Sequence, residues 1–323
     1  MILLLTHTED FYTVDLVKES LRKKGMNSIR IDLDAFPERF FITEMISDQG
    51  KSFELRSGDQ RLHLNTVQGV WLRKYFAPKI SQEIEPEFRD GCFRESKAVM
   101  DILLQVLGEL PCIDPFEVIQ KANNKFYQLE TAKASGIRIP KTLITNDPEQ
   151  LKIFYENAGP DIIAKMLTQL STSMQGASYF MYTSMVGPEH MEDADTLKNC
   201  PMVFQEHIAK QYELRIIYVD GHFFTGKVNA SGSKLGKTDW RKSTPDEVKW
   251  EHYTLPEGLR QQLSDFMKKI GLIYGAIDMI CSAEGEYVFL EVNPTGEWGM
   301  LQRDLGLAVS DAIAQALVNR IKQ

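Results

Sequence analysis

Two short glycine turns in the last third of the chain constrain its fold more than any other feature of the sequence. Asp220-Gly221 and Glu284-Gly285 each separate two apolar segments of strand length. A turn of this kind between apolar segments predicts a β-hairpin. The sequence therefore predicts two antiparallel hairpins, one over 213–228 and one over 275–292.

The start of the chain predicts a different arrangement. Residues 2–6 and 28–34 are expected to be strands, and 11–24 a helix that stops at Gly25. Such a β-α-β unit favours a parallel sheet. No G-x-G-x-x-G motif follows the first strand, so a dinucleotide-binding fold is not expected. Because 323 residues are too many for one core, we expect two or three units.

The composition indicates a globular protein with no membrane span. Hydrophobic residues make up 43% and charged residues 25% of the chain. No apolar run reaches the roughly 20 residues that cross a bilayer. The net charge of -8 argues against a nucleic-acid partner. The four cysteines form neither a CxxC pair nor a zinc spacing, which indicates thiols in a reducing cytoplasm.

The middle of the chain is expected to contain helices and short strands. One helix is predicted over 118–135, ended by Gly136, and strands over 142–145 and 161–166. The acidic stretch that follows carries Glu189, Glu192, Asp193 and Asp195. This stretch is either a solvated helix face or a docking surface for a basic partner.

The second hairpin carries the strongest chemical signal. A two-residue loop at Glu284-Gly285 gives a register that places Asp278 opposite Glu291. Asn293 lies two residues further on and shares their face. Facing carboxylates repel, but two carboxylates and an amide oxygen suit Mg²⁺ that is shared with phosphates. The alternative is the solvent-facing side of an edge hairpin, and the apolar neighbours on both strands favour the metal site.

Two lysines and a small-residue segment are candidates for binding phosphates. Lys165 interrupts an apolar strand, where lysine is uncommon, and Lys125 lies on the predicted helix before it. Taken alone, either lysine is better explained as a solvated surface charge. The stretch 171–178 has backbone N–H groups that can cover phosphates. Its single Gly176 makes a surface loop an equal alternative.

Two further strands supply candidate nucleotide and catalytic residues. The strand over 203–208 is a candidate for holding adenine by backbone hydrogen bonds. Glu213 and Arg215 alternate on one face of the next strand, and Lys227 lies on the strand that pairs with it. Taken alone, these charges are better explained as a surface salt-bridge pair.

The order of these segments resembles the ATP-grasp superfamily. The resemblance rests on Asn124-Lys125, Gly136 to Asn146, Lys165, Gln205 to Ile208, Asp278 and Glu291-Val-Asn293-Pro294. It implies an ATP-grasp fold behind an N-terminal β-α-β pre-ATP-grasp domain. The implied domains are 1–116, a central subdomain 117–201 and a C-terminal subdomain 202–323.

The resemblance also implies roles for these residues. Lys125 and Lys165 bind the ATP phosphates, and Glu213 binds the ribose. The adenine segment consists of Gln205, Glu206, His207 and Ile208. The Mg²⁺ ligands are Asp278, Glu291 and Asn293. The catalytic candidates are Arg215, Arg241 and Lys227, and the two guanidinium groups suit acyl phosphate oxygens.

A narrower resemblance links the chain to the microviridin-type ATP-grasp macrocyclases. It rests on 3–7, 32–37, 70–73, 239–241 and 293–298. It implies a homodimer that activates Asp or Glu side chains of a ribosomally made precursor peptide and closes ω-amide or ω-ester rings. The opening 3–7 favours the amide-forming branch. The acidic residues at 189–195 would then bind the leader part of the peptide.

Three other functions stay open at this point. A stand-alone peptide or amino-acid ligase would use the same nucleotide residues. A non-catalytic ATP-binding peptide sensor would keep the nucleotide site without turnover, and the intact metal triad weighs against it. A structural scaffold would need none of these residues.

Overall fold

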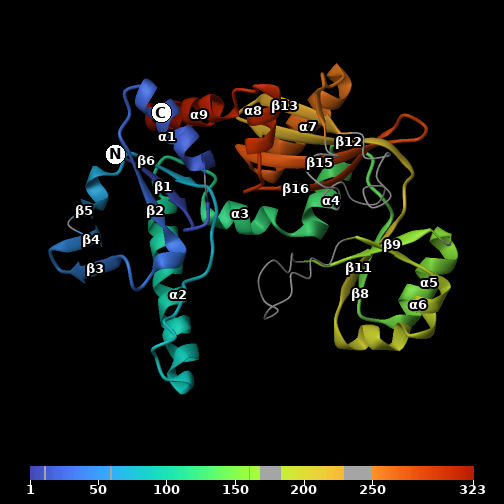
Figure 1. The fold of residues 1–323 in the computed structure, drawn as a ribbon, viewed down its shortest axis with the longest axis horizontal. Helices are drawn as coiled ribbons and strands as arrows, with labels where there is room; N and C mark the ends of the chain where they lie inside the picture. The colour runs from blue at the N-terminus through green and yellow to red at the C-terminus, as the bar shows by residue number, and fades with distance from the viewer. Residues whose placement is uncertain (11, 59, 160, 168–182, 229–248) are drawn as a thin grey trace.

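The structure is a computed structural model that describes all residues except 11, 59, 160, 168–182 and 229–248 (Figure 1). Its described strands form four sheets. None of its described helices has the length and apolar character needed to span a bilayer.

The N-terminal unit is built on a parallel sheet, as the sequence predicts. Its strand order is β2-β1-β6-β7, and each neighbouring pair is parallel. The strands are β1 (Ile2–Thr6), β2 (Ser28–Asp32), β6 (Gly69–Leu72) and β7 (Cys112–Ile113). Helices α1 (Tyr12–Lys23) and α2 (Pro86–Gly108) flank it, and a small sheet joins β3 (Phe41–Ser47), β4 (Gly50–Ser57) and β5 (Gln60–His63).

The prediction of a single helix over 118–135 is wrong. The chain forms α3 (Phe116–Ala122) and α4 (Lys125–Ala134), because the Asn124 side chain caps the second helix by accepting a bond from the Tyr127 N–H at 3.1 Å. Asparagine competes with helical backbone bonds and favours such caps. The break places Lys125 at the N-terminus of α4, where the helix dipole favours anions.

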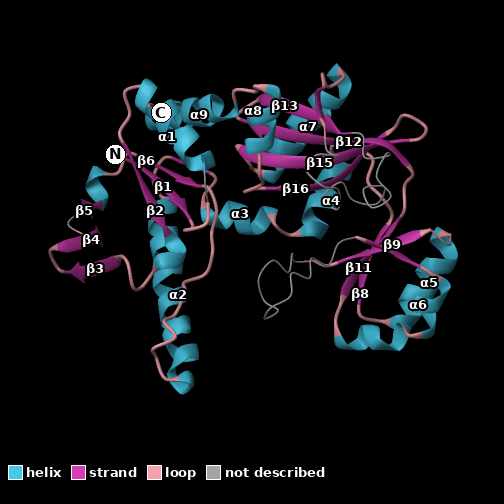
Figure 2. Cartoon of the chain, viewed as in Figure 1, coloured by secondary structure: helices cyan, strands magenta, loops and turns pink. Residues whose placement is uncertain are grey.

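The central unit is an antiparallel sheet covered on one face. Its strand order is β10-β9-β11-β8. The strands are β8 (Thr142–Thr145), β9 (Ile162–Lys165), β10 (Ser184–Val186) and β11 (Met202–Glu206). Helices α5 (Pro148–Ala158) and α6 (Pro188–Glu192) and the 3-10 turn Ala194–Asn199 lie beside it (Figure 2), and Leu151, Leu197 and Phe204 share one core.

Two groups of elements pack across the predicted domain limits, which stay a prediction. Strand β11 belongs to the central sheet, which extends past the predicted boundary at residue 201. Helices α3 and α4, assigned to the central subdomain, pack instead on the C-terminal sheet through Ala122, Leu129 and Ala132. An apolar pattern identifies a strand or a helix, but it does not identify the sheet that covers it.

The C-terminal unit contains both predicted hairpins. Its sheet has the order β14-β13-β12-β15-β16 and is antiparallel throughout. The strands are β12 (Lys210–Val219), β13 (His222–Val228), β14 (Trp250–His252), β15 (Tyr274–Ser282) and β16 (Tyr287–Asn293). Helix α7 (Glu257–Ile270) packs with α4 on one face, and α8 (Gly299–Leu305) and α9 (Val309–Ile321) end the chain.

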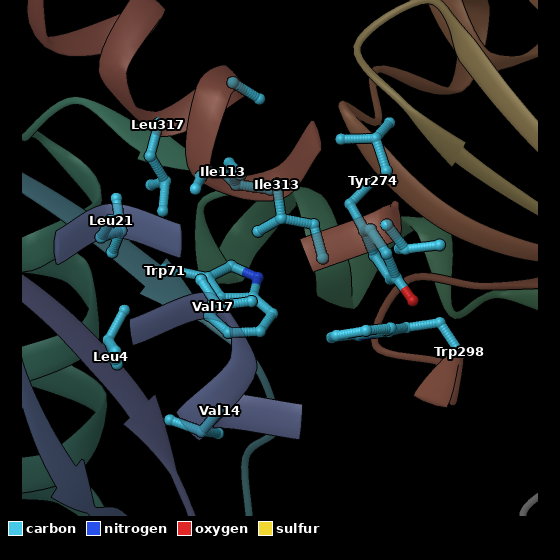
Figure 3. Packing of buried hydrophobic residues seen from close by; sticks show 14 of the residues in the cluster. Leu4, Val14, Val17, Leu21, Trp71, Ile113, Tyr274, Trp298, Ile313 and Leu317 are labelled. Carbon is cyan, nitrogen blue, oxygen red and sulfur yellow. The ribbon is translucent and has the colours of Figure 1, made fainter. Parts of the chain in front are cut away.

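One apolar core joins the N-terminal unit to the other face of this sheet. Figure 3 shows Val17 and Trp71 of the N-terminal unit facing Ile313 of α9, with Trp298 next to Tyr274. All five side chains are at most 3% exposed. Burial of each large apolar side chain stabilises the fold by about 1.5–3 kcal/mol, so the two units hold each other in place.

A buried carboxylate fastens the same junction. Asp114, just past β7, accepts hydrogen bonds from the N–H groups of Ile273 and Tyr274 at 2.8 and 2.9 Å. It adopts a left-handed backbone conformation with φ of 53°. Burial raises the pKa of Asp114 from 3.8 to about 7, although the two N–H groups oppose this rise.

We expect the stability of the folded chain to fall as pH rises from about 4 to about 7. The folded state holds a proton on Asp114 in this window, whereas the unfolded chain has released it. Below this window both states hold the proton, and above it neither does. Melting temperatures across this range should show the decline, and Asp114→Asn should flatten it. Equal slopes for parent and variant would contradict this assignment.

Candidate active site

Three charged side chains stand in one row across the C-terminal sheet. Arg215 on β12 is the register partner of Asp278 on β15, and Asp278 is the partner of Glu291 on β16. Directly paired residues of an antiparallel sheet point to the same face. The predicted facing of Asp278 and Glu291 is confirmed.

The row occupies the polar end of a sheet face whose other end is apolar. Along β12 the odd-numbered Ile217 and Val219 lie in the core shared with the N-terminal unit, whereas Leu214 and Ile216 pack under α7. Arg215 continues the odd-numbered series. The site therefore lies where the N-terminal unit stops covering the sheet.

A local irregularity sets this register. Ser282 donates its N–H to the Glu286 carbonyl at 2.8 Å, so the turn over 283–285 is one residue longer than predicted. Gly285 takes φ of 86° there, as the last position of a three-residue hairpin loop requires. A register shift between Asp278 and Met279 then restores the pairing with Glu291.

Each carboxylate of the pair is matched by a cation. Arg215 Nη1 donates to both oxygens of Asp278, at 2.8 and 2.9 Å, and both residues are 7% exposed. Lys125 Nζ donates to Glu291 Oε2 at 2.5 Å. The repulsion expected between facing carboxylates is thus offset from two sides.

Arg215 also holds the loop that follows β16. Its Nε and Nη2 donate to the Glu297 carbonyl at 3.2 and 2.9 Å, so four hydrogen bonds use the guanidinium. Gly296 makes this approach possible, because a Cβ there would overlap Ala276 and lie 2.9 Å from Arg215 Nη2. The loop backbone therefore lies directly against the charged row.

Sequence reasoning about the site missed the clamp that holds this loop from the N-terminal unit. Arg73, 1% exposed, donates from Nη1 to the Thr295 carbonyl at 2.7 Å and from Nη2 to Glu297 Oε2 at 2.6 Å. Lys74 also bonds Glu297. Burial raises the pKa of Glu297, but Arg73 and Lys74 outweigh it and hold that pKa below its ordinary value. The only sequence signal was the resemblance carried by 70–73 and 293–298.

The oxygen ligands fit Mg²⁺ that is completed by a nucleotide. Across the described residues, no three His, Cys, Asp or Glu side chains converge as a metal cage. Mg²⁺ commonly takes one or two protein carboxylates and its other ligands from phosphates and water. Asp278 and Glu291 suit this pattern. Asn293 Oδ1 is oriented by the Thr295 N–H at 3.0 Å.

The central sheet presents the second group of predicted residues. Lys165 is the register partner of Val203, and Gln205 that of Thr142, on the face turned away from the α5 core. Gln205 donates to Thr142 Oγ1 at 2.9 Å, while its buried Oε1 has no hydrogen-bond partner in the described structure. A buried acceptor of this kind is costly unless a bound group satisfies it.

The predicted adenine segment keeps only part of its backbone available. The N–H groups of Glu206 and His207 donate to the carbonyls of Lys141 and Asp161, at 3.1 and 2.9 Å. Backbone recognition of adenine must therefore use other groups of this segment, such as those of Ile208. Its role in binding stays a prediction.

The structure brings only some predicted catalytic residues to the charged row. Glu213 shares the face of Arg215 and binds Lys210 Nζ at 2.8 Å. Lys227 is the register partner of Leu214 and so lies on the opposite face, where it binds Glu251 at 3.1 Å. Arg241 and the stretch 171–178 lie outside the described residues.

The acidic stretch lies on the outer surface of the central unit. Glu189, Glu192, Asp193 and Asp195 are all exposed, on α6 and the 3-10 turn after it. Asp195 pairs with Lys198 at 3.0 Å. The stretch presents a negative surface, and its role stays a prediction.

Comparisons with known proteins agree with this site and fold. Residues 1–120 match the MvdD pre-ATP grasp domain family, and residues 122–317 match the RimK-like ATP-grasp domain family. The macrocyclase MdnB from Microcystis aeruginosa MRC is 40% identical, with 98% of each chain covered and a TM-score of 0.84.

Two solved relatives contain peptides. A RiPP-associated ATP-grasp ligase from Chryseobacterium gregarium, in complex with ADP and a leader and core peptide, is 30% identical with a TM-score of 0.91, over 99% of this chain and 96% of that one. The macrocyclase MdnC from Microcystis aeruginosa MRC, bound with the precursor peptide MdnA, is 32% identical with a TM-score of 0.88, over 98% of this chain and 99% of that one.

These matches define the class of the protein as an ATP-dependent ligase. The chain belongs to the RimK-like ATP-grasp family and, within it, to the ATP-grasp peptide macrocyclases. The resemblance seen in the sequence is thereby confirmed over almost the whole chain.

Proposed function

We propose that the chain uses ATP and Mg²⁺ to activate Asp or Glu side chains of a ribosomally made precursor peptide and closes ω-amide rings onto lysine. The observation that carries this proposal is the row of Arg215, Asp278 and Glu291, completed by Lys125. The similarity to peptide-bound ligases over 98–99% of the chain supports the choice of substrate.

The chemistry has two steps. A substrate carboxylate attacks the γ-phosphate, ADP leaves, and an acyl phosphate forms. The lysine amine then displaces phosphate, a C–N bond replaces the C–O bond, and a proton is released. Mg²⁺ on Asp278, Glu291 and Asn293 would supply charge neutralisation of the phosphates. The protein mainly positions the reactants, which needs rigid side chains rather than a covalent intermediate.

The named residues have distinct parts in this proposal. Lys125 and Lys165 bind phosphate oxygens, and Glu213 binds the ribose. Arg215 fixes Asp278 and the loop at Glu297, and keeps one of its five N–H groups for an acyl phosphate oxygen. Arg241 is proposed to bind the remaining oxygens.

We also propose a homodimer that works in the cytoplasm. The four cysteines are free thiols, as a reducing compartment allows. The proposal of a dimer rests on the family resemblance, and sedimentation at micromolar concentration tests it.

The proposal is tested by mass spectrometry of a precursor peptide encoded by a neighbouring gene, after incubation with the protein, ATP and Mg²⁺. Each closed ring should remove about 18 Da, the mass of one water. Mild alkaline treatment reopens ester rings and leaves amide rings intact, so it distinguishes the two products. A gain in mass would instead show a stand-alone amino-acid ligase. ATP hydrolysis with an unchanged peptide would contradict the proposal.

Removing either phosphate lysine should weaken ATP binding. A charge-assisted hydrogen bond is worth roughly 1.5–3 kcal/mol, so Lys165→Ala and Lys125→Ala should each raise the dissociation constant about tenfold or more. Lys125→Ala should weaken Mg²⁺ binding less than it weakens ATP binding, because it frees the Glu291 carboxylate. Calorimetry measures both, with the exposed Lys152→Ala as control. Unchanged affinity in both variants would remove the lysines from the site.

Reversing charge on the acidic stretch should weaken leader binding. Glu192 and Asp193 are exposed, so their change to lysine should repel a basic leader and leave ATP affinity unchanged. The effect should shrink with salt, since exposed charges are screened beyond about 8 Å at physiological ionic strength. Anisotropy of a labelled leader peptide measures it. The same reversal of Glu149 and Glu156 on α5 is the control, and equal loss there would refute a specific surface.

A further inference from the structure

A cavity of about 190 Å³ lies in the N-terminal unit, between β2 and the small β3–β5 sheet. One water molecule needs only roughly 10–15 Å³ of such space, so the cavity has room for a side chain. Its apolar walls come from Phe40 and from residues of β2, β4 and β5. Its polar lining comprises Thr8, Arg30, Asp32, Arg39, Arg56 and Ser57.

The cavity is locally positive in a chain of net charge -8. Arg30 is committed to the protein, because its Nε donates to Asp32 Oδ1 at 2.7 Å and its Nη2 to the His7 carbonyl at 2.9 Å. Arg39 and Arg56 form no salt bridge with any carboxylate in the described part of the chain. These two guanidinium groups are therefore uncompensated.

The other acidic group close to the cavity is also satisfied. Asp34 accepts bonds from the Thr8 N–H and hydroxyl, both at 2.8 Å, and from Lys79 at 2.7 Å. Arg56 is held in place from one side, with its Cζ 4.1 Å from the centre of the Phe41 ring. A stacked, planar guanidinium keeps its N–H edges free for a carboxylate.

The cavity lies at the ligand-binding edge of a parallel sheet. Thr8 follows β1, and Asp32 ends β2, so the cavity opens at the carboxyl ends of these strands, where α/β sheets bind ligands. His7 precedes Thr8 and lies within the electrostatic influence of Arg73 and Lys74. Those two residues hold the loop next to Asp278.

We propose that this cavity binds a carboxylate side chain of the acidic peptide substrate, with Arg39 and Arg56 as the recognising groups. The proposal rests on the function proposed above, since such a substrate carries acidic residues besides the one being activated. The guanidinium forks match carboxylate geometry, and the apolar walls accept the methylene groups. A grip away from the reacting carboxylate raises its effective concentration at the active site.

The test measures binding of a synthetic, labelled peptide of alternating glutamate and threonine to the full chain at low salt. The double variant Arg39→Ala/Arg56→Ala should bind it about tenfold more weakly, and Arg56→Lys, which keeps the charge but loses the fork, should be intermediate. The double variant Arg22→Ala/Arg94→Ala removes the same charge from exposed sites elsewhere and should bind normally.

Each outcome decides the proposal. Parent-like binding by Arg39→Ala/Arg56→Ala, or equal binding of a glutamine-for-glutamate peptide by the parent, overturns it. Binding of inorganic phosphate that depends on both arginines, without peptide binding, assigns the cavity to a small anion and overturns it as well. If the parent binds the acidic peptide through both arginines but closes no rings, the proposed function fails while the cavity assignment stands.

Discussion

Replacing Glu291 with glutamine is expected to slow ATP-dependent ligation by about a thousandfold, which corresponds to roughly 4 kcal/mol of transition-state stabilisation. The amide keeps the shape and an oxygen acceptor, but it loses the charge that neutralises a bound Mg²⁺. Glu291 is half-buried, and glutamine keeps a side-chain oxygen that can accept the bond from Lys125. The fold should therefore tolerate the change, and the loss should appear in the rate of ring closure and in the Mg²⁺ concentration needed.

Glutamate 284 provides the matched control for this experiment. Glu284 lies in the turn of the same hairpin and is exposed. Glu284→Gln makes the identical chemical change away from the row, so its ligation rate should equal that of the parent. If Glu291→Gln retained both the rate and the Mg²⁺ requirement of the parent, the carboxylate would not be a metal ligand.

Asp278→Asn is a less clean test of the same site. The structure adds a cost, because Asp278 is buried and accepts both bonds of Arg215 Nη1. Removing one partner of a buried ion pair is destabilising in general. Loss of activity in this variant therefore mixes a chemical effect with a structural one.

The facing of Asp278 and Glu291 was predictable because side chains alternate along a strand with a fixed period of two. The predicted two-residue loop was one residue too short, which alone would move Glu291 out of register. The shift between Asp278 and Met279 compensates for it. The pairing was thus obtained correctly although one of its two premises was wrong. A sequence pattern contains no signal for such a compensating irregularity.

The same rule would have placed Lys227 correctly. A two-residue turn at Asp220-Gly221 pairs Lys227 with Leu214, and the structure shows this pair. Leu214 belongs to the core under α7, so Lys227 cannot share the face of Arg215. The grouping of Lys227 with Arg215 rested on strand pairing without its register.

The clamp around Glu297 could not be predicted from the sequence, for a different reason. Arg73 and Glu297 are separated by more than two hundred residues, and they meet only because one apolar core joins the N-terminal unit to the C-terminal sheet. Local patterns show that Arg73-Lys74 follow β6, but they do not show which loop lies there. Periodicity predicts the elements within one unit, but it does not predict the contacts between units.

Arg215 connects these parts, since it binds the Asp278 carboxylate on one side and the clamped loop on the other. Its four hydrogen bonds leave little freedom for the guanidinium to move during a reaction cycle. Its main contribution is therefore to fix Asp278 and the Glu297 backbone relative to each other. The loss of Arg215 is therefore expected to affect stability and activity together.

Arg215→Ala should lower the free energy of unfolding by about 3–5 kcal/mol, because it leaves the buried Asp278 carboxylate without its cation. Arg215→Lys restores the charge but not the fork, and should recover only part of this loss. Saturating Mg²⁺ and ADP should raise the melting temperature of Arg215→Ala more than that of the parent, since a second cation then reaches Asp278. A merely structural arginine would give equal shifts in both proteins, and that result would separate Arg215 from the metal site.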